Sequence, residues 1–401
     1  MHCTRNIQDD LVYIGGSDRR LSRFENLFPI PRGVSYNSYV LLDDKTVLFD
    51  TADEAVGRLF FENLEYALGG RSLDYLVVHH MEPDHCVLLG EVLHRWPELK
   101  LVCSAKALSM IGQFFPLDVA DRTLVVGEGD KLSTGRHMLH FFMAPMVHWP
   151  EVMVTYDEMS KTLFTADAFG VFGALAGNIF DDEIDFDSAW LADARRYYAN
   201  ICGKYGAQVQ AVLKKAAALD IAAICPLHGP VWRTNPGLLI EKYEKWSTYE
   251  PEEPAVVILY ATMYGNTENA ASVLASRLAD RGVRNLAMYD VSDVDVSYLV
   301  AEVFRCSHLV LAAPTYNGGL HPRMETLLAD MKALSVQNRT VALIENGTWA
   351  PVSGRHMAAR LAEMKNMTLL DGTVTLKSSG GGLQLEGLTA LAETIAAQLQ
   401  Q

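Results

Sequence analysis

Four residues of the kind that bind metal ions follow a short apolar run in this sequence. The run Leu76–Val78 predicts a buried strand, and soon after it come His80, Glu82, Asp84 and His85. A strand that stops at such a cluster delivers imidazole and carboxylate groups to one point in space. Because hard oxygen donors are mixed here with imidazole, the cluster favours iron over a site made of nitrogen ligands alone. The segment therefore predicts a metal site carried by a sheet.

Three further ligand-type residues stand at the ends of later apolar runs. His148 follows the strand-like HMLHFFMA, Asp167 ends TLFTAD, and His228 comes after AAICPL. Each of them alone is explained equally well by a structural hydrogen bond, or for Asp167 by the capping of a turn. With the first cluster they make seven candidate ligands, which are too many for one tetrahedral ion. Two metal ions that share a bridging carboxylate fit the set.

Charge and composition exclude several classes of partner. The formal net charge of −15 leaves no basic surplus to neutralise phosphates, so we expect neither nucleic acid nor an anionic membrane as a partner. The N-terminus lacks the pattern of a signal peptide, and no run approaches the roughly 20 apolar residues that span a bilayer. The six cysteines are scattered without a CxxC pair, which is typical of free thiols in the cytoplasm. They cannot build a cysteine-ligated iron site such as a fused rubredoxin module needs.

The length of 401 residues predicts two domains, or three, and a change of pattern marks the main boundary. The segment Tyr249–Pro254 holds two prolines and three glutamates, which neither continue a helix nor enter a central strand. We therefore divide the chain into residues 1–250 and 251–401. The second part alternates five β-branched runs with helical stretches and predicts an open, doubly wound parallel sheet. The first part mixes strands such as YVLLDD and YLVVHH with helices, which predicts a sheet-rich α/β sandwich.

Three loops of the second part are suited to binding a phosphorylated ring. The loop Thr262–Thr267 follows the run VVILYA and leads into a helix, whose N-terminal hydroxyls and amides suit a phosphate. It lacks GxGxxG, so a monophosphate as in FMN fits better than a dinucleotide. The other two loops follow the third and fourth strands, so all three open at the C-terminal edge of one sheet. The candidate cofactor-binding residues are Thr262, Met263, Tyr264, Gly265, Asn266, Thr267, Pro314, Thr315, Tyr316, Asn317, Gly318, Gly319, Asn346, Gly347, Thr348 and Trp349.

Two aromatic residues of these loops bear on the nature of the ligand. Tyr316 and Trp349 each offer a face or an edge to an isoalloxazine ring, and packing in the core or at the rim is their alternative role. The glycine-rich segment Lys377–Gly382 is open to two interpretations, a flap that closes over a flavin or a plain flexible turn.

The chain resembles the flavodiiron proteins along nearly its whole length. In the first part, GVSYNSYVLLDD and the strand end VLFDT are similar to the metallo-β-lactamase fold, with Glu82 where a zinc hydrolase usually has a third histidine. The HxExDH variant and the spacing of the later ligands resemble the flavodiiron proteins. In the second part, TMYGNT and APTYNGG resemble flavodoxin, whereas ENGTWAP departs from its pattern. The resemblance implies an N-terminal metallo-β-lactamase-like αββα sandwich and a C-terminal flavodoxin-like doubly wound parallel sheet.

The resemblance also implies FMN and two non-haem iron ions as cofactors. The implied ligands are His80, Glu82 and His148 for one iron, Asp84, His85 and His228 for the other, and Asp167 as the bridge. Whether His85 is on the metal stays open. Adjacent His79 falls outside the motif, and we interpret it as structural or as a residue that supports a ligand.

The same resemblance implies a cytoplasmic enzyme that reduces dioxygen to water, nitric oxide to nitrous oxide, or both. Electrons from an external donor such as rubredoxin would pass through FMN to the irons. A head-to-tail homodimer, or a dimer of dimers, would place one subunit's flavin beside the other's irons. One ring of the pair Tyr197 and Tyr198 either lines the metal pocket or packs within its helix. Two other functions remain open, a dinuclear zinc hydrolase fused to a flavodoxin module and a non-catalytic electron carrier with a structural metal.

Overall fold

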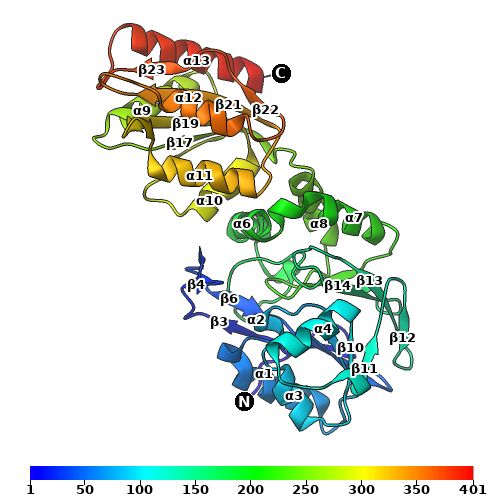
Figure 1. The fold of residues 1–401 in the computed structure, drawn as a ribbon. Coiled ribbons are helices and arrows are strands. Elements are labelled where there is room, and N and C mark those ends of the chain that lie inside the picture. Colours follow the sequence, from blue (N-terminus) through cyan, green and yellow to red (C-terminus); the bar gives the residue numbers. More distant parts are fainter. Residues whose placement is uncertain (401) are drawn as a thin grey trace. The chain divides into compact units, whose positions relative to one another are not determined.

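The structure is a computed structural model that describes residues 1–400, apart from the side chain of Leu383 (Figure 1). The chain forms two compact units. The first comprises Met1–Tyr198 and Ala207–Glu244, and the second comprises Ala199–Gly206 and the residues from Lys245 onward. The division into residues 1–250 and 251–401 stays a prediction.

The first unit is built around two sheets (Figure 1). The larger sheet contains, in spatial order, β1 (Arg5–Asn6), β2 (Leu11–Tyr13), β7 (Tyr39–Leu42), β8 (Thr46–Phe49), β9 (Tyr75–Val78), β10 (Lys100–Cys103) and β11 (Thr123–Val125). The smaller sheet contains β12 (Lys131–Ser133), β13 (Met138–Met143), β14 (Met153–Asp157), β15 (Thr162–Phe164) and β16 (Ala223–Cys225). Two further antiparallel pairs are β3 (Gly16–Asp18) with β6 (Val34–Tyr36), and β4 (Arg23–Phe24) with β5 (Phe28–Pro29).

Helices accompany these sheets, and α1 and α4 contact β7 and β11 of the larger one. The α-helices up to the end of this part are α1 (Gly57–Leu68), α2 (Pro83–Cys86), α3 (Leu89–Arg95), α4 (Ala105–Phe114), α5 (Phe186–Ala189), α6 (Leu191–Tyr197), α7 (Gly206–Ala216) and α8 (Pro236–Ser247). Shorter helical turns are η1 (Glu54–Val56), η2 (Ala120–Arg122), η3 (Asp181–Glu183), the π-turn η4 (Tyr198–Cys202) and η5 (Gly203–Tyr205). The sequence of α1 explains its placement, because its buried Phe60, Leu64 and Leu68 recur at helical spacing and Gly69 ends it with φ of 56°.

In the core of the first unit, side chains from the two sheets pack against each other. β8 and β9 pair in parallel, and most of their side chains are buried and apolar, as expected for strands covered on both faces. Phe49 of β8 stacks on Phe164 of β15 with ring centroids 3.9 Å apart. The expected two-sheet sandwich is therefore confirmed.

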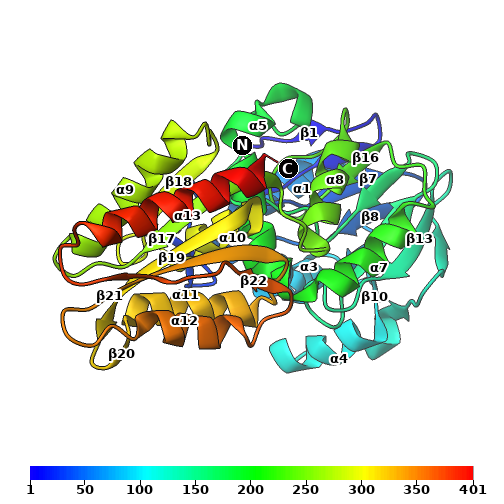
Figure 2. The same ribbon diagram turned by 90° about the horizontal axis from the view of Figure 1, so that it is seen from above.

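The second unit contains one sheet, parallel except for the short strand β20, with helices on both faces (Figures 1 and 2). Its strands are, in spatial order, β18 (Leu286–Asp290), β17 (Glu253–Tyr260), β19 (Cys306–Tyr316), β21 (Arg339–Asn346) and β22 (Met367–Leu369), with β23 (Val374–Leu376) beside β21 and β20 (Gly319–Leu320) beside β19. Helices α9 (Asn266–Asp280) and α13 (Leu383–Leu399) pack together on one face, and α10 (Val296–Arg305), α11 (Pro322–Ala333) and α12 (Ser353–Leu361) lie on the other. The strand order confirms the expected doubly wound, flavodoxin-like arrangement.

The segment after α8 departs from one expectation. We expected the prolines of Tyr249–Pro254 to keep this segment out of the sheet, but β17 begins at Glu253 and includes Pro254. The pairing of β17 with β19 shifts register between Glu253 and Val256. A strand accepts a residue without an N–H at such an irregularity, so the expectation was wrong at this one proline.

Arg339 binds the segment before β17 through hydrogen bonds. Its buried guanidinium donates to the carbonyls of Tyr249, Val303 and Phe304 over 2.8, 2.7 and 2.9 Å. Burial lowers the pKa of Arg339 to about 10. One side chain thus holds together the start of β21, the end of α10 and the segment that leads into β17.

Candidate metal centre and cofactor pocket

The first ligand cluster owes its compactness to a strand followed at once by a helical turn. β9 ends at Val78, and the short helix α2 begins at Pro83. Proline suits this first helical position because the N–H that it lacks would have no helical partner there. As a result His80 leaves the strand end while Asp84 and His85 project from the turn.

The later candidates arrive from the second sheet. β15 and β16 are parallel neighbours, and Asp167 and His228 follow their respective ends. His148 lies in the connection between β13 and β14. Because parallel strands end at one edge of a sheet, Asp167 and His228 lie close together. Both also approach the first cluster, with Asp167 3.0 Å from His85 and His228 3.4 Å from Asp84.

One group of four buried side chains converges on a single point. His80, Glu82, His148 and Asp167 offer ligand atoms that all lie within 4.8 Å of one another. Oε2 of Glu82 lies 3.1 Å from Nε2 of His80 and 3.0 Å from Nε2 of His148. Oδ2 of Asp167 lies 3.1 Å from the same His148 nitrogen.

A second group lies on the other side of Asp167. Asp84, His85 and His228 also bring their ligand atoms within 4.8 Å of one another. Here the contact with Asp167 is made by Oδ1, which lies 3.0 Å from Nε2 of His85 and 3.7 Å from Nε2 of His228. The two oxygens of Asp167 therefore face two different groups of ligands.

The donor atoms of the second group are arranged to bind a cation and not to form hydrogen bonds among themselves. Nε2 of His85 and Nε2 of His228 lie only 3.1 Å apart. Asp84 is buried, with an exposure of only 8%. Neither of its carboxylate oxygens accepts a hydrogen bond from any residue that the structure describes. Buried polar atoms normally have partners, so these oxygens suit a metal ion that would supply one.

Electrostatics lead to the same conclusion. Burial lowers the pKa of His148, but the carboxylates of Asp167 and Glu82 outweigh it and raise the pKa to about 9. Burial likewise opposes the charge on His85, and Asp84 and Asp167 raise its pKa to about 9. The carboxylates thus attract positive charge to both imidazoles, which is the environment in which a metal cation binds.

Glu151 supports the site, and sequence reasoning missed it. Its Oε1 lies 2.7 Å from Nδ1 of His80 and accepts the backbone N–H of Met81 over 2.9 Å. A carboxylate on the far nitrogen of a histidine fixes the ring so that Nε2 faces the metal. The available signal was its place in HWPE, three residues after His148.

His79 stays outside both groups. Its Nδ1 lies 2.5 Å from Asp50 and its Nε2 lies 2.7 Å from the hydroxyl of Thr155. Both ring nitrogens are therefore engaged with the protein, which gives this histidine a structural role between β8 and β14.

Sequence reasoning also missed Glu25, on the turn between β4 and β5. Although the residue as a whole is exposed, partial burial of its carboxyl group and the neighbouring carboxyl group of Glu82 raise the pKa of Glu25 to about 8. No motif or spacing marks this residue, because it lies far from the ligands in sequence.

Of the two adjacent tyrosines, Tyr197 is the one beside the metal centre. Its ring centroid lies 5.6 Å from that of His228, whereas Tyr198 packs against Tyr243 at 4.9 Å. Tyr197 therefore lines the region around His228, and Tyr198 packs against α8.

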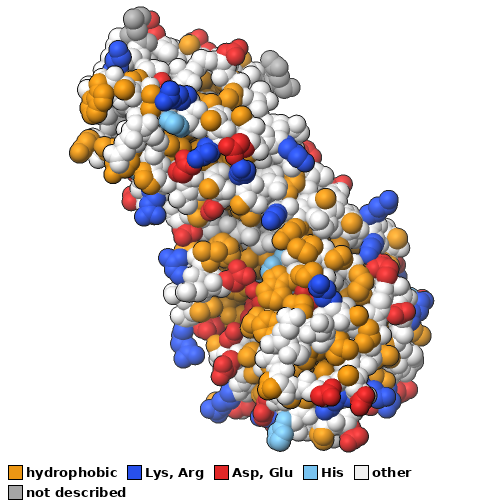
Figure 3. Space-filling model, viewed as in Figure 1, with side chains coloured by type: hydrophobic (Ala, Val, Ile, Leu, Met, Phe, Trp, Pro, Cys, Tyr) orange, Lys and Arg blue, Asp and Glu red, His pale blue; other side chains and the backbone are white. Residues whose placement is uncertain are grey.

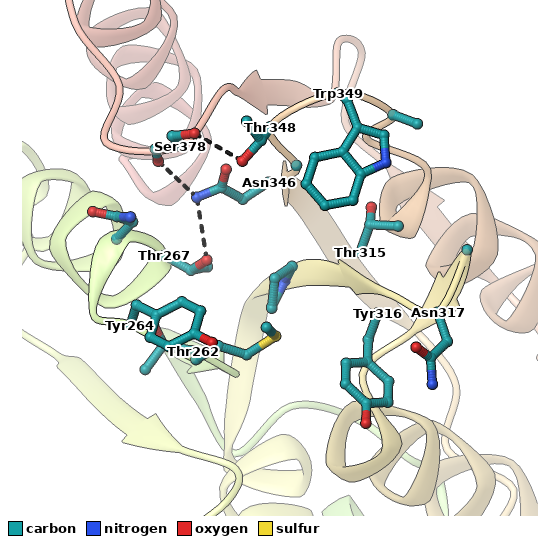
Figure 4. A pocket seen from close by; sticks show the side chains of 16 residues that line it. Thr262, Tyr264, Thr267, Thr315, Tyr316, Asn317, Asn346, Thr348, Trp349 and Ser378 are labelled. Carbon is teal, nitrogen blue, oxygen red and sulfur yellow. Dashed lines mark hydrogen bonds between the residues drawn. The ribbon is translucent and has the colours of Figure 1, made fainter.

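The second unit holds a cavity of about 430 Å³ at the C-terminal edge of its sheet (Figure 4). Its wall consists of Thr262, Met263, Tyr264, Asn266, Thr267, Pro314, Thr315, Tyr316, Asn317, Gly318, Asn346, Gly347, Thr348, Trp349, Ala350 and Ser378. The structure thus brings together the expected cofactor residues apart from Gly265 and Gly319, and it adds Ala350 and Ser378. Gly265 has φ of 83° and precedes α9, so it shapes the loop instead of forming the wall.

Hydrogen bonds link the loops on one side of this cavity (Figure 4). The side-chain amide of Asn346 donates to the hydroxyl of Thr267 over 3.4 Å and to the carbonyl of Ser378 over 3.0 Å. The hydroxyls of Thr348 and Ser378 lie 2.9 Å apart. Ser378 belongs to the glycine-rich segment Lys377–Gly382, so this segment forms part of the cavity wall.

The rim of the cavity carries exposed aromatic rings. Tyr264 and Trp349 are 87% and 90% exposed, and Tyr316 is 41% exposed. Aromatic rings beside a helix N-terminus offer a planar ring surface and a phosphate position within one cavity.

The surface lacks a strongly basic face in the view of Figure 3. Lys and Arg side chains there are interspersed with Asp and Glu. Among the helices of residues 1–400, none is both long enough and apolar enough to cross a membrane.

Comparison with protein families matches two models to the chain. Residues 34–229 match the model described as ODP family beta lactamase, and residues 258–368 match the flavodoxin model. The two matches fall on the sheets that carry the metal groups and the cavity, respectively.

Individual proteins match both parts together. The anaerobic nitric oxide reductase flavorubredoxin of Vibrio vulnificus (strain YJ016) is 28% identical over 90% of this chain and 73% of its own length. An uncharacterized protein of Methanocaldococcus jannaschii is 31% identical over 82% of this chain and 81% of its own. The solved structure of rubredoxin oxygen:oxidoreductase from Desulfovibrio gigas superposes with a TM-score of 0.91 at 28% identity, over 99% of this chain and 98% of that one.

Proposed function

Because the chain belongs to the flavodiiron family, we propose that it reduces dioxygen to water, nitric oxide to nitrous oxide, or both. It is an oxidoreductase whose cofactors are FMN and a non-haem di-iron site. The proposal rests most on Asp167, whose two oxygens face two separate groups of buried ligands. A carboxylate placed in this way suits a pair of metal ions that it bridges.

Each iron would receive imidazole and carboxylate donors from the chain. The proposed ligands are His80, Glu82 and His148 for one iron, Asp84, His85 and His228 for the other, and Asp167 as the bridge. When bound, the irons supply electrons and open coordination positions for a diatomic gas, and FMN relays further electrons to them. The chain's own part is to hold the donors in a buried place, and Glu151 orients His80 for this purpose.

In the second unit, the loop Thr262–Thr267 and the N-terminus of α9 would bind the FMN phosphate. The rings of Tyr264, Tyr316 and Trp349 would contact the isoalloxazine ring. The 430 Å³ cavity is of a size that suits a ligand of this class.

The electron donor would be a separate carrier such as rubredoxin. Support comes from the names of the relatives, one a flavorubredoxin and the other a rubredoxin oxygen:oxidoreductase. A head-to-tail homodimer, or a dimer of dimers, would cover Tyr264 and Trp349, whose exposure of 87% and 90% suits burial against a second copy. A cytoplasmic location accords with six free cysteines, five of them buried.

Metal analysis combined with gas consumption tests the proposal. Protein purified without oxygen should contain two iron ions and one FMN per chain, measured by elemental analysis and by the flavin absorption spectrum. With chemically reduced rubredoxin it should consume dioxygen, nitric oxide or both, and side-by-side rates would rank the two gases. Two zinc ions and no iron would refute the proposal in favour of a dinuclear hydrolase. Iron without flavin would refute the electron path through FMN.

A further inference from the structure

One residue of the cavity wall in the second unit comes from a segment outside the three loops that were expected to form it. Ser378 follows β23 and lines the cavity together with those loops. The adjacent Ser379 is exposed and is not part of the wall. Of the two serines in the segment Lys377–Gly382, only Ser378 is therefore placed to contact a ligand in the cavity.

Hydrogen bonds extend the pairing of β21 and β23 beyond the ends of these strands and hold Ser378 in place. Asn346, the last residue of β21, pairs with Leu376, and the next N–H, that of Gly347, donates to the carbonyl of Leu376 over 3.2 Å. The side-chain amide of Asn346 donates to the carbonyl of Ser378 over 3.0 Å. These contacts do not involve the hydroxyl of Ser378, so the hydroxyl is not needed to position this segment.

The hydroxyls of Thr348 and Ser378 form a pair, 2.9 Å apart, in the wall of the cavity (Figure 4). One hydroxyl of such a pair donates its only hydrogen to the other, and the second hydroxyl keeps its own O–H. The Thr348–Ser378 hydroxyl pair can therefore both donate a hydrogen bond to a ligand and accept one from it. An alcohol group of a ligand, which also donates and accepts, matches this pair better than a phosphate oxygen, which only accepts.

The pair lies between the part of the cavity suited to a phosphate and the part suited to a planar ring (Figure 4). Toward the phosphate position, the amide of Asn346 donates to the hydroxyl of Thr267 over 3.4 Å, and Thr267 belongs to the first turn of α9. Toward the rim, Trp349 follows Thr348 directly and is 90% exposed. In FMN the group between the phosphate and the ring is the ribityl chain, which carries alcohol groups.

We propose that the Thr348–Ser378 hydroxyl pair binds the ribityl chain of FMN, which makes Ser378 a cofactor-binding residue. This inference rests on the FMN site of the proposed function and deepens it. It gives the segment Lys377–Gly382 a fixed contact with the ligand through its second residue.

Titration of the full-length protein, freed of flavin, with FMN, riboflavin and lumiflavin tests this role. Riboflavin lacks the phosphate, lumiflavin lacks both the phosphate and the ribityl chain, and the change in flavin fluorescence reports the binding of each. In Ser378→Ala, we expect FMN and riboflavin to bind more weakly by the same factor, about three- to tenfold, which is the usual effect of one hydrogen bond. Lumiflavin should bind as it does to wild type, because it has no ribityl chain.

Ser379→Ala is the matched control. It removes the same hydroxyl group from the adjacent serine, which is not part of the cavity wall, so the affinity for each flavin should stay at the wild-type value. Ser378→Gly is a second variant without the hydroxyl. Ser378 has φ of 58°, which glycine adopts without strain, so this variant should show the same loss as Ser378→Ala.

Several results would overturn the inference. Unchanged FMN affinity in Ser378→Ala would show that the hydroxyl does not bind the ligand, and an equal loss in Ser379→Ala would show a general effect of the segment. A loss confined to FMN would place the hydroxyl on the phosphate, and an equal loss for lumiflavin would make Ser378 a structural part of the ring site. Wild-type protein that binds none of the flavins would instead refute the FMN site of the proposed function, so the two failures are distinguishable.

Discussion

Replacing Glu151 with alanine should weaken iron binding although Glu151 is not one of the proposed ligands. The side chain is 1% exposed, and its Oε1 both contacts Nδ1 of His80 at 2.7 Å and accepts the N–H of Met81 at 2.9 Å. Alanine removes both contacts from the far side of a ligand ring. His80 is then free to rotate, and its Nε2 loses the electron density that a hydrogen-bonded carboxylate lends to the ring.

The expected size of the effect follows from the loss of this one support. Removing a group that orients a metal-binding histidine typically lowers metal affinity about 10–100-fold, or about 1.4–2.8 kcal/mol. Glu151→Gln should lower iron affinity about tenfold or less, because the amide oxygen can still accept hydrogen bonds from Nδ1–H of His80 and from the N–H of Met81. The order of iron affinity should therefore be wild type, glutamine variant and alanine variant.

Iron release into a chelator measures this effect. Iron-loaded protein is incubated with ferrozine, and the fraction of iron retained is followed at increasing chelator concentrations. Glu158→Ala is the control, because Glu158 also pairs with a histidine, His140, at 3.0 Å but is 62% exposed and lies outside the metal groups. Equal iron retention in wild type and Glu151→Ala would refute the reasoning, and so would equal losses in Glu151→Ala and Glu158→Ala.

Four other perturbations have definite outcomes. Asp167→Ala should lose iron and gas reduction but keep FMN, because the metal groups and the cavity belong to separate units; elemental analysis and flavin absorption check this, and flavin loss would contradict it. Thr267→Ala should show the reverse, weaker FMN retention on dialysis with wild-type iron content. Burial alone would raise the pKa of Asp43, but hydrogen bonds led by the N–H of His137 hold it at about 2. The stability that ionised Asp43 contributes, about 2 kcal/mol, is thus fully present above pH about 4 and is lost as the pH falls toward 2. In Asp43→Asn the free energy of unfolding, measured with urea, should therefore depend less on pH between about 4 and 2. Arg339→Met leaves buried carbonyls without a donor and should lower the unfolding free energy by at least about 3 kcal/mol, measured by thermal unfolding of the flavin-loaded protein.

The candidate ligands could be predicted from the sequence because most of them follow apolar runs. Such runs form buried strands, and the ends of neighbouring parallel strands lie at one edge of a sheet. Asp167 and His228, which follow the parallel neighbours β15 and β16, therefore meet, with side-chain atoms 3.7 Å apart. The same reasoning brings together the three loops around the flavin cavity, because β17, β19 and β21 are parallel neighbours.

Glu151 and Glu25 could not be predicted in this way. Glu151 lies in the connection before β14, and its reach to His80 depends on how that loop folds, for which the sequence carries no periodic signal. Gly265 and Gly319 were included among the cofactor-binding candidates together with their loops, but neither lines the cavity, whereas Gly318 and Gly347 do. The loop sequences thus indicate where a ligand binds more reliably than which residues contact it.

The β4–β5 hairpin shows why residues near the metal centre escape sequence rules. A left-handed glutamate costs roughly 1–2 kcal/mol, whereas full burial of a phenylalanine such as Phe24 contributes roughly 2 kcal/mol, so the two neighbours nearly offset each other. The positive φ of Glu25 and Asn26 and the hydrogen bond from Leu27 to Phe24 define a type I′ turn, which by itself favours asparagine or glycine at position 25. The place of the hairpin is set instead by contacts between segments far apart in the chain, because Phe24 packs against Phe172 and lies edge-on to His228.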